Sequence, residues 1–217
     1  DGGADIVALA DALGLERFAV AGWSSGGPYA LAVGALAPER IRGLAVIAGD
    51  APTDELPELL EEESGAGRER IRAIREGDPS ALASLRARLA WFAESPDRLL
   101  GAATGNDDEP DMRMRAVPAY RAALESMFAE GFRQGSAGFE ADWLASYRPW
   151  GFRLADVRVP VDVWWGDADR LSSRGHADAL VARIPEARFH LVPGGGHSIA
   201  ATEWSAILDA LLASRDA

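Results

Sequence analysis

Apolar residues in the first fifty positions fall into short unbroken runs that alternate with amphipathic segments. Near the N-terminus, apolar residues recur three and four positions apart, which predicts one helix face: Ile6, Leu9, Ala10 and Leu13. The runs 18–21 and 43–49 are continuously apolar, as is typical of parallel strands covered on both faces. A helical pattern over about 25–36 separates these two runs. This alternation of helix and strand predicts βαβ units.

The pattern changes between Asp50 and about Asp156, where no run typical of a buried strand occurs. Amphipathic helical segments broken by prolines and glycine-rich turns take its place, with two apolar faces: Leu82, Leu85, Leu89 and Phe92, then Tyr120, Leu124, Met127 and Phe128. Four aromatic residues are expected to form the core of this region, with contact to a substrate as the alternative: Trp91, Phe92, Trp143 and Trp150. The pattern therefore predicts a helical cap inserted at 50–156.

Strand patterns return near the C-terminus, over 159–165 and 188–192, with a helical pattern over about 172–184 between them. A last helix is predicted over about 203–213. The four apolar runs and the helices between them predict an α/β fold with a mostly parallel sheet and helices on both faces. We expect its core to comprise 1–49 and 157–217.

One serine marks the point where the first apolar run meets the first long helix, in the sequence Gly22-Trp23-Ser24-Ser25-Gly26. The order of strand, Gly-x-Ser-x-Gly and helix is that of a nucleophile elbow, a sharp turn that lifts a serine hydroxyl above the sheet edge. Such a turn crowds the backbone two residues before and after the serine, where glycine is favoured. Centring the motif on Ser25 would put Trp23 at a crowded position, so Ser24 is the candidate. By itself, the motif also fits a glycine-rich turn that opens a helix or cradles phosphate.

Charge and composition narrow the classes of partner. The chain has 217 residues, a net charge of −12 and no basic cluster, which argues against nucleic acid and anionic membranes as partners. The absence of cysteine excludes disulfides, cysteine-based metal sites and a thiol nucleophile, and we expect neither a metal nor a cofactor. No stretch resembles a signal peptide or a membrane span, which favours a cytoplasmic location.

Three chemically different side chains follow predicted strand ends: Ser24, Asp169 and His197. The carboxyl ends of parallel strands meet at one edge of a sheet, where ligands bind. A serine hydroxyl is a weak nucleophile until a base takes its proton, and the base needs a carboxylate to hold its tautomer. The three residues therefore predict acyl transfer. Asp167 and Asp50 are alternatives for the acid.

The other two histidines have structural explanations. His190 falls inside a predicted strand, where an ordinary buried or edge histidine is expected. His176 falls on a predicted helix and is expected at the surface. His197 follows three glycines at a strand end, where little in the fold requires a histidine.

The sequence resembles the α/β-hydrolase superfamily, in its cap-bearing lipase, esterase and peroxidase-like branch. The resemblance rests on three segments that together span nearly the whole chain: Val20-Ala21-Gly22-Trp23-Ser24-Ser25-Gly26-Gly27, the Gly-x-x-Asp at 166–169, and Gly196-His197. It implies an α/β-hydrolase fold and hydrolysis of a small or medium apolar ester or related carbonyl compound through an acyl-enzyme.

The same resemblance assigns roles to individual positions. It implies that Ser24 is the nucleophile, Asp169 the acid, His197 the base, and the Ser25 backbone N–H an oxyanion donor. Trp23, beside the nucleophile, is expected either to bind substrate as part of the acyl pocket or to pack under the cap.

The chain departs from the family pattern at its start. Members usually carry about four strands and a helix before the elbow, with a loop that supplies a second oxyanion N–H, whereas 23 residues precede Ser24 here. We therefore expect that a missing N-terminal segment or a second chain completes the sheet. Without it, activity should be poor, because one oxyanion donor is worth about 10²–10³ in rate. The alternative is a non-catalytic small-ligand binding protein or an inactive fragment.

Overall fold

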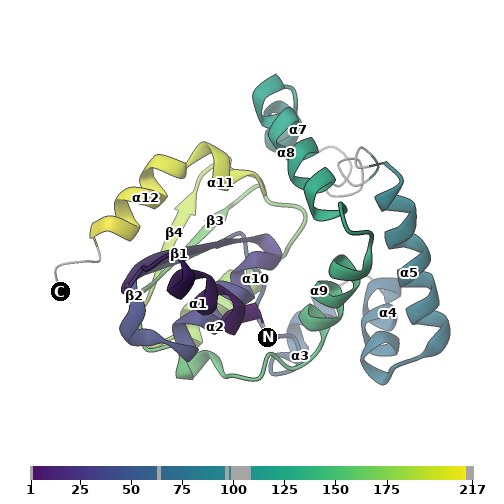
Figure 1. The fold of residues 1–217 in the computed structure, drawn as a ribbon, viewed down its shortest axis with the longest axis horizontal. Helices are drawn as coiled ribbons and strands as arrows, with labels where there is room; N and C mark the ends of the chain where they lie inside the picture. Colours follow the sequence, from purple (N-terminus) through teal and green to yellow (C-terminus); the bar gives the residue numbers. More distant parts are fainter. Residues whose placement is uncertain (1, 63–64, 96–97, 99–108, 214–217) are drawn as a thin grey trace. The chain divides into compact units, whose positions relative to one another are not determined.

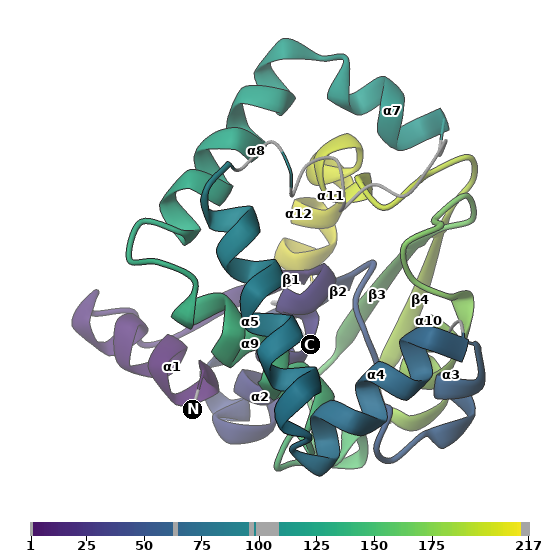
Figure 2. The same ribbon diagram turned by 90° about the vertical axis from the view of Figure 1, so that its right-hand side faces the viewer.

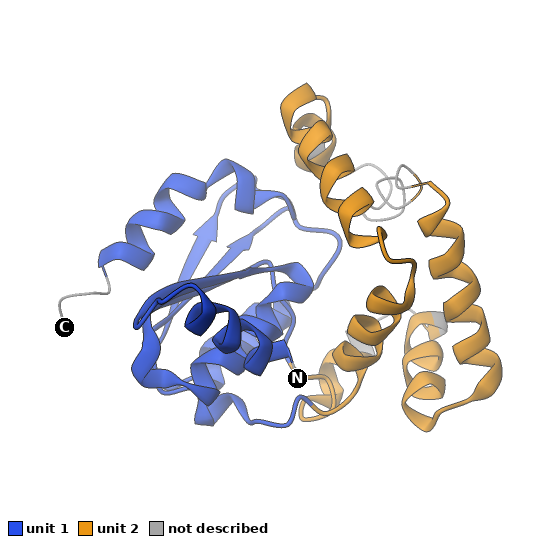
Figure 3. Cartoon of the chain, viewed as in Figure 1, with its two compact units in different colours: residues 1–51, 150–217 blue, residues 52–149 orange. Residues whose placement is uncertain are grey.

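The computed structural model describes residues 2–62, 65–95, 98 and 109–213 (Figure 1). The chain divides into two compact units, coloured separately in Figure 3. Unit 1 comprises Asp1–Ala51 and Trp150–Ala217, and unit 2 comprises Pro52–Pro149. The structure thus assigns the α/β part and the helical insertion to separate units.

Unit 1 contains a four-stranded parallel sheet, in the order β1 (Phe18–Trp23), β2 (Ile41–Ile47), β3 (Val161–Gly166) and β4 (Ala187–Val192). Strands that follow one another in sequence are neighbours in the sheet. Because all four strands are parallel, their carboxyl ends lie at one edge of the sheet. The predicted α/β fold with a parallel sheet is confirmed.

Helices cover both faces of this sheet (Figure 1). They are α1 (Gly2–Ala12), α2 (Gly27–Leu36), α10 (Arg174–Arg183), α11 (Ile199–Thr202) and α12 (Trp204–Ala213), with short 3-10 turns at Ser24–Gly26, Pro38–Arg40 and Leu154–Asp156. Side chains alternate between the two faces of a strand. On one face of β2, a Cβ at Gly43 would lie 2.6 Å from the Leu211 carbonyl oxygen of α12. On the other face, a Cβ at Gly34 of α2 would lie 2.7 Å from Leu44 Cδ1.

The apolar core between the sheet and α12 brings together β2, β3 and the two C-terminal helices, through Ala45, Ile47, Ala48, Trp164, Ile199, Ile207 and Leu211. Leu44, Val46, Val161 and Val163 are also fully buried on β2 and β3. These two strands are covered on both faces, as their unbroken apolar runs predict.

The N-terminal helix and β1 are less well covered. Helix α1 ends at Ala12, before a turn in which Gly14 has a φ of +68°. Of its apolar face, however, Leu9 remains 59% and Leu13 64% exposed. Strand β1 is an edge of the described sheet, with Ala19 and Ala21 exposed. That a further segment pairs with this edge stays a prediction.

Unit 2 is helical wherever it has regular structure in the described ranges (Figure 2). Its helices are α3 (Pro57–Glu62), α4 (Gly65–Glu76), α5 (Pro79–Ala93), α7 (Glu109–Arg115), α8 (Pro118–Gly131) and α9 (Ala137–Tyr147). Helices α4, α5 and α9 pack together around Ile74, Leu85, Leu89, Phe92 and Phe132. The apolar face predicted for α5 is thus its buried face, whereas on α8 Leu124 is buried and Met127 is 46% exposed.

Two of the aromatic residues expected in the core of the insertion lie elsewhere. Trp91 is 50% exposed, because it lies about 100° around the helix from its neighbour Phe92, and Phe92 is on the buried side. Trp150 belongs to unit 1, where it lies beside Phe152. Trp143 does pack against the buried cluster of unit 2.

Arg75 of α4 joins the two ends of unit 2. Its guanidinium donates hydrogen bonds to Thr53 Oγ1 and to the Tyr147 carbonyl oxygen. Burial lowers the pKa of this guanidinium, against the opposing effect of Asp54.

The structure contains no helix, within the described residues, that is long and apolar enough to cross a bilayer.

Candidate active site

Ser24 lies at the turn that follows β1, with a φ of +54°. Of the described residues other than glycine, Ser24 and Ala48 have a positive φ. Holding such a residue in this region of backbone space costs of order 1–3 kcal/mol, which surrounding structure must offset. Ser24, and not Ser25, therefore occupies the strained apex of an elbow.

The expected crowding of the backbone on either side of Ser24 is confirmed at Gly22, and the expectation is wrong at Gly26. A Cβ at Gly22 would lie closer than 3.0 Å to the main chain of Gly26, so no side chain fits there. A Cβ at Gly26 would meet nothing within 4 Å. The second crowded position is Gly27, where a Cβ would lie 3.0 Å from Val46 Cγ1 and 3.3 Å from the Gly49 Cα. The neighbouring strand β2, rather than the turn itself, imposes this second constraint.

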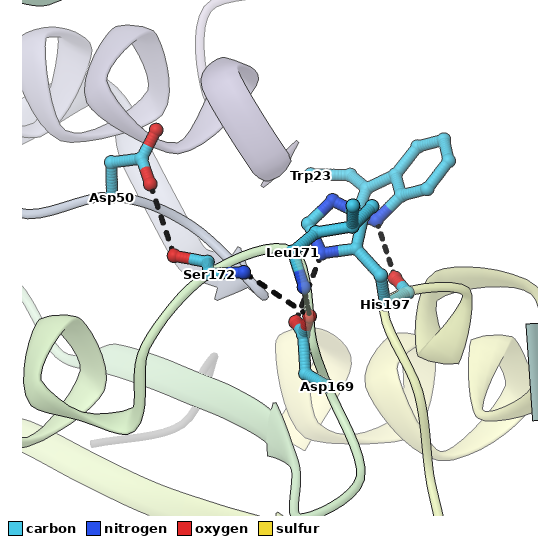
Figure 4. Close-up of polar contacts among 6 residues, drawn as sticks. All are labelled: Trp23, Asp50, Asp169, Leu171, Ser172 and His197. Atoms are coloured by element: carbon cyan, nitrogen blue, oxygen red, sulfur yellow. Dashed lines mark hydrogen bonds and ion pairs between the residues drawn. The ribbon is translucent and has the colours of Figure 1, made fainter. Parts of the chain in front are cut away.

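His197 and Asp169 form a close pair beyond the ends of β4 and β3 (Figure 4). His197 Nδ1 lies 2.9 Å from Asp169 Oδ2, with the aspartate side chain fully buried and the imidazole side chain 10% exposed. The other carboxylate oxygen of Asp169 accepts hydrogen bonds from the backbone N–H groups of Leu171, at 2.9 Å, and Ser172, at 3.3 Å. A carboxylate at Nδ1 selects the tautomer in which Nε2 carries the lone pair.

The two alternative carboxylates have other partners. Asp167 Oδ1 accepts a hydrogen bond from the Gly194 N–H at 2.6 Å, within the loop that leads to His197. Asp50 Oδ1 accepts one from the Ser172 hydroxyl at 3.2 Å. Of these three aspartates, Asp169 is the one observed against the imidazole, and the other two support neighbouring loops.

The loops after β3 and β4 are joined along their main chains. The Ala168 N–H donates to the Gly195 carbonyl oxygen at 2.9 Å. A Cβ at Gly166 would lie closer than 3.0 Å to that same carbonyl oxygen. Close main-chain approach, made possible by glycine, therefore sets the separation of the loop that carries Asp169 from the loop that carries His197.

Trp23 connects the elbow to the histidine loop. Its indole Nε1–H donates a hydrogen bond of 2.8 Å to the His197 carbonyl oxygen, and the two rings lie 5.7 Å apart between centroids. The residue next to Ser24 thus contacts His197 directly (Figure 4). Trp23 also packs against the core beneath α12, and a role in an acyl pocket stays a prediction.

The remaining histidines are structural in different ways. His176 is 6% exposed and its Nδ1 accepts a hydrogen bond from the Ala51 N–H, so the predicted surface location is wrong. His190 stacks on Trp164 with centroids 4.2 Å apart. Its Nε2 lies 2.8 Å from a carboxylate oxygen of the buried Asp162. A charged residue within the apolar run 159–165 was the sequence signal for this cluster.

The described residues hold no group of three His, Asp or Glu side chains that could bind a metal ion. The three residues of the candidate site, Ser24, Asp169 and His197, each lie just beyond the carboxyl end of a parallel strand.

A model of the alpha/beta hydrolase fold matches residues 3–203. The chain belongs to the α/β-hydrolase fold family. It is similar to the polyketide synthase ThaQ of Burkholderia thailandensis, at 27% identity over 199 residues, which is 91% of this chain. The chain spans 8% of the length of that synthase.

Solved structures of α/β-hydrolase proteins share this fold. A hydrolase from Pseudomonas aeruginosa PA01 matches 99% of this chain and 71% of its own, at 23% identity and a TM-score of 0.63. Est816, described as an N-acyl homoserine lactone degrading enzyme, matches 95% of this chain and 72% of its own, at 20% identity and a TM-score of 0.60.

Proposed function

We propose that this α/β-hydrolase chain is a serine hydrolase with Ser24 as nucleophile, His197 as general base and Asp169 as the acid of the triad. The observation that carries the proposal is the close pair of His197 and Asp169, joined through Trp23 to the turn that holds Ser24. A buried carboxylate on Nδ1 and a strained serine at an elbow are the features that acyl transfer requires.

In the proposed reaction, Ser24 Oγ attacks the substrate carbonyl carbon while His197 Nε2 takes the hydroxyl proton. Asp169 stabilises the imidazolium that forms, and the Ser25 backbone N–H donates to the oxyanion. His197 then gives the proton to the leaving alcohol, which departs as the acyl-enzyme forms. A water molecule, deprotonated by His197, attacks the acyl-enzyme and releases the acid and Ser24.

We infer a small or medium apolar ester or a related carbonyl compound, including a lactone, as the substrate. The likeness to Est816, a lactone-degrading enzyme, supports including lactones among the compounds to test. Carbon–carbon bond hydrolysis and perhydrolysis use the same three side chains, so a substrate panel has to include both.

The test compares the Ser24→Ala and Ser25→Ala variants in hydrolysis of a p-nitrophenyl ester. Ser24→Ala should lower kcat by at least about 10³-fold, since removal of the nucleophile eliminates the covalent route. Ser25→Ala keeps its backbone N–H and should stay within about tenfold of the wild-type chain. Hydrolysis by Ser24→Ala at the wild-type rate would overturn the proposal.

A pre-steady-state measurement separates an enzyme from a binding protein. An acyl-enzyme mechanism predicts a burst of p-nitrophenol equal to the concentration of active sites when deacylation is slow. A non-catalytic ligand-binding protein of the same fold would release none. The burst should be absent from Ser24→Ala, which serves as the matched control.

A further inference from the structure

Ser172 makes two hydrogen bonds with two different aspartates. Its backbone N–H donates to Asp169 Oδ1 at 3.3 Å, and its hydroxyl donates to Asp50 Oδ1 at 3.2 Å (Figure 4). The first bond helps to orient the carboxylate that faces His197. The second ties the same loop to the segment that follows β2.

The segment that follows β2 is fixed at a second point. The Ala51 N–H donates to Nδ1 of the buried His176 at 2.9 Å, on the helix α10 into which the Ser172 loop leads. Asp50 and Ala51 are the last residues of unit 1 before unit 2 begins at Pro52. Two adjacent residues therefore bind one loop and the helix that continues it.

The weaker of the two backbone bonds to Asp169 comes from Ser172. At 3.3 Å it is longer than the 2.9 Å bond from Leu171, and it lies at the long end of ordinary N–H···O distances. Because the Ser172 bond is the longer of the two, we expect it to be lost more easily when the loop moves. Without the Ser172 hydroxyl bond, the loop has one fewer constraint on the direction of that N–H.

We propose that Ser172, anchored by Asp50, is a positioning residue that orients Asp169 toward His197. This inference rests on the proposed triad. It adds that Ser172 connects Asp169 to Asp50, in the segment of unit 1 that precedes Pro52. With Asp169 held in place, its Oδ2 stays on Nδ1 and stabilises the imidazolium in the transition state. When the loop is loosened, the carboxylate rotates away for part of the time and this stabilisation falls.

The first experiment measures the rate at which a fluorophosphonate probe labels Ser172→Ala, with Ser172→Thr as the variant that keeps the hydroxyl. We expect Ser172→Ala to label about five- to twentyfold more slowly, and Ser172→Thr to recover most of the wild-type rate. Ser146→Ala is the matched control, because that serine in unit 2 also donates its hydroxyl, to the Asp142 carbonyl oxygen. Wild-type labelling by Ser172→Ala would overturn the inference.

The pH profile of labelling distinguishes positioning from general loop stability. In Ser172→Ala the acidic limb should move to lower pH, because a less well oriented Asp169 stabilises the protonated base less. Ser172→Thr should restore the limb. A fall in Tm with an unmoved acidic limb would assign Ser172 a purely structural role and contradict the proposal.

A double-mutant cycle tests the partner. Asp50→Ala should slow labelling as much as Ser172→Ala, and the double variant should be no slower than either single variant, because both remove one contact. Independent, multiplying effects would exclude the Asp50 anchor.

A readout without any probe separates this inference from the proposed function. The proton on His197 Nδ1, shared with Asp169, should give a low-field NMR signal that broadens in Ser172→Ala and returns in Ser172→Thr. A signal unchanged in Ser172→Ala contradicts positioning, even in a chain that labels. Broadening in a chain that does not label at Ser24 supports positioning and shows that the proposed nucleophile is wrong.

Discussion

The two units of the chain hold their residues in place by different means. In unit 1, the positions of the candidate active-site residues depend on close main-chain contacts that only glycine permits, at Gly22 and Gly166. In unit 2, order comes from apolar packing around residues such as Phe92 and from arginine–carboxylate pairs on exposed surfaces. The difference teaches where damage should appear. A small group added at these glycines of unit 1 should abolish activity, whereas a lost apolar contact in unit 2 should mainly lower the free energy of unfolding.

The largest expected effect is that of Gly22→Ala, compared with Gly26→Ala. The added methyl group at position 22 would overlap the Gly26 main chain, so we expect loss of at least about 3 kcal/mol of unfolding free energy and of most probe labelling. Gly26 has a φ of −76° and open space around it, so alanine there should cost under about 1 kcal/mol. Denaturant unfolding and labelling measure both. Equal behaviour of the two variants would contradict the steric account of the elbow.

The next effect separates chemistry from folding. Asp169→Asn should lower ester turnover by roughly 10²–10⁴-fold, because an amide at Nδ1 no longer selects the correct tautomer or stabilises the imidazolium. The free energy of unfolding should change much less. Asp167→Asn is the comparison, since its carboxylate accepts from the Gly194 N–H and does not face the imidazole in the observed contacts. If Asp167→Asn were the more damaging to turnover, the acid would have to be reassigned.

A core substitution in unit 2 tests the other half of the comparison. Phe92→Ala should cost about 3–5 kcal/mol of unfolding free energy, because Phe92 is 2% exposed and its removal leaves a cavity. Trp91→Ala, at a half-exposed neighbouring position, should cost clearly less. The labelling rate of the folded Phe92→Ala protein should stay within about tenfold of wild type. Complete loss of labelling in folded protein would show that unit 2 contributes directly to the chemistry.

The smallest effect concerns acid stability in unit 1. Hydrogen bonds from the Arg153 side chain and backbone hold the pKa of Asp156 below its ordinary value of 3.8. A lowered folded-state pKa stabilises the fold above the unfolded value, and this contribution is lost as the pH falls below 3.8. Arg153→Ala should therefore show a slightly shallower loss of stability in that acid range, measured by thermal unfolding. At neutral pH, the free energy of unfolding should change by no more than the small contribution of an exposed ion pair. A steeper loss in Arg153→Ala would reverse the predicted sign.

Much of the fold could be predicted from periodicity, because buried parallel strands and amphipathic helices leave different apolar patterns. Strands β2 and β3 and helix α5 follow those patterns closely. That a carboxylate and His197 would lie near one another was also predictable, since Asp167, Asp169 and His197 come after strand ends that a parallel sheet brings to one edge. The sequence could not show which carboxylate would face the imidazole, because that depends on how two loops meet.

The errors have a common cause in contacts between distant segments. Gly26 was expected to be crowded, but β2 crowds Gly27 instead. His176 was expected at the surface, yet the Ala51 N–H, 125 positions away in sequence, lies against its ring nitrogen. Ser172 carried no signal at all, since its backbone N–H, which any non-proline residue supplies, is what reaches Asp169. Local patterns contain no information on such long-range partners.

The central claim, that Ser24 is a nucleophile activated by His197, is tested most directly by locating a covalent adduct. The wild-type chain is treated with a fluorophosphonate, digested and analysed by tandem mass spectrometry, with His197→Ala in parallel. We predict one adduct on Ser24, none on Ser25, and a loss of labelling in His197→Ala. An adduct on another residue, or equal labelling of Ser24 without the imidazole, would contradict the account.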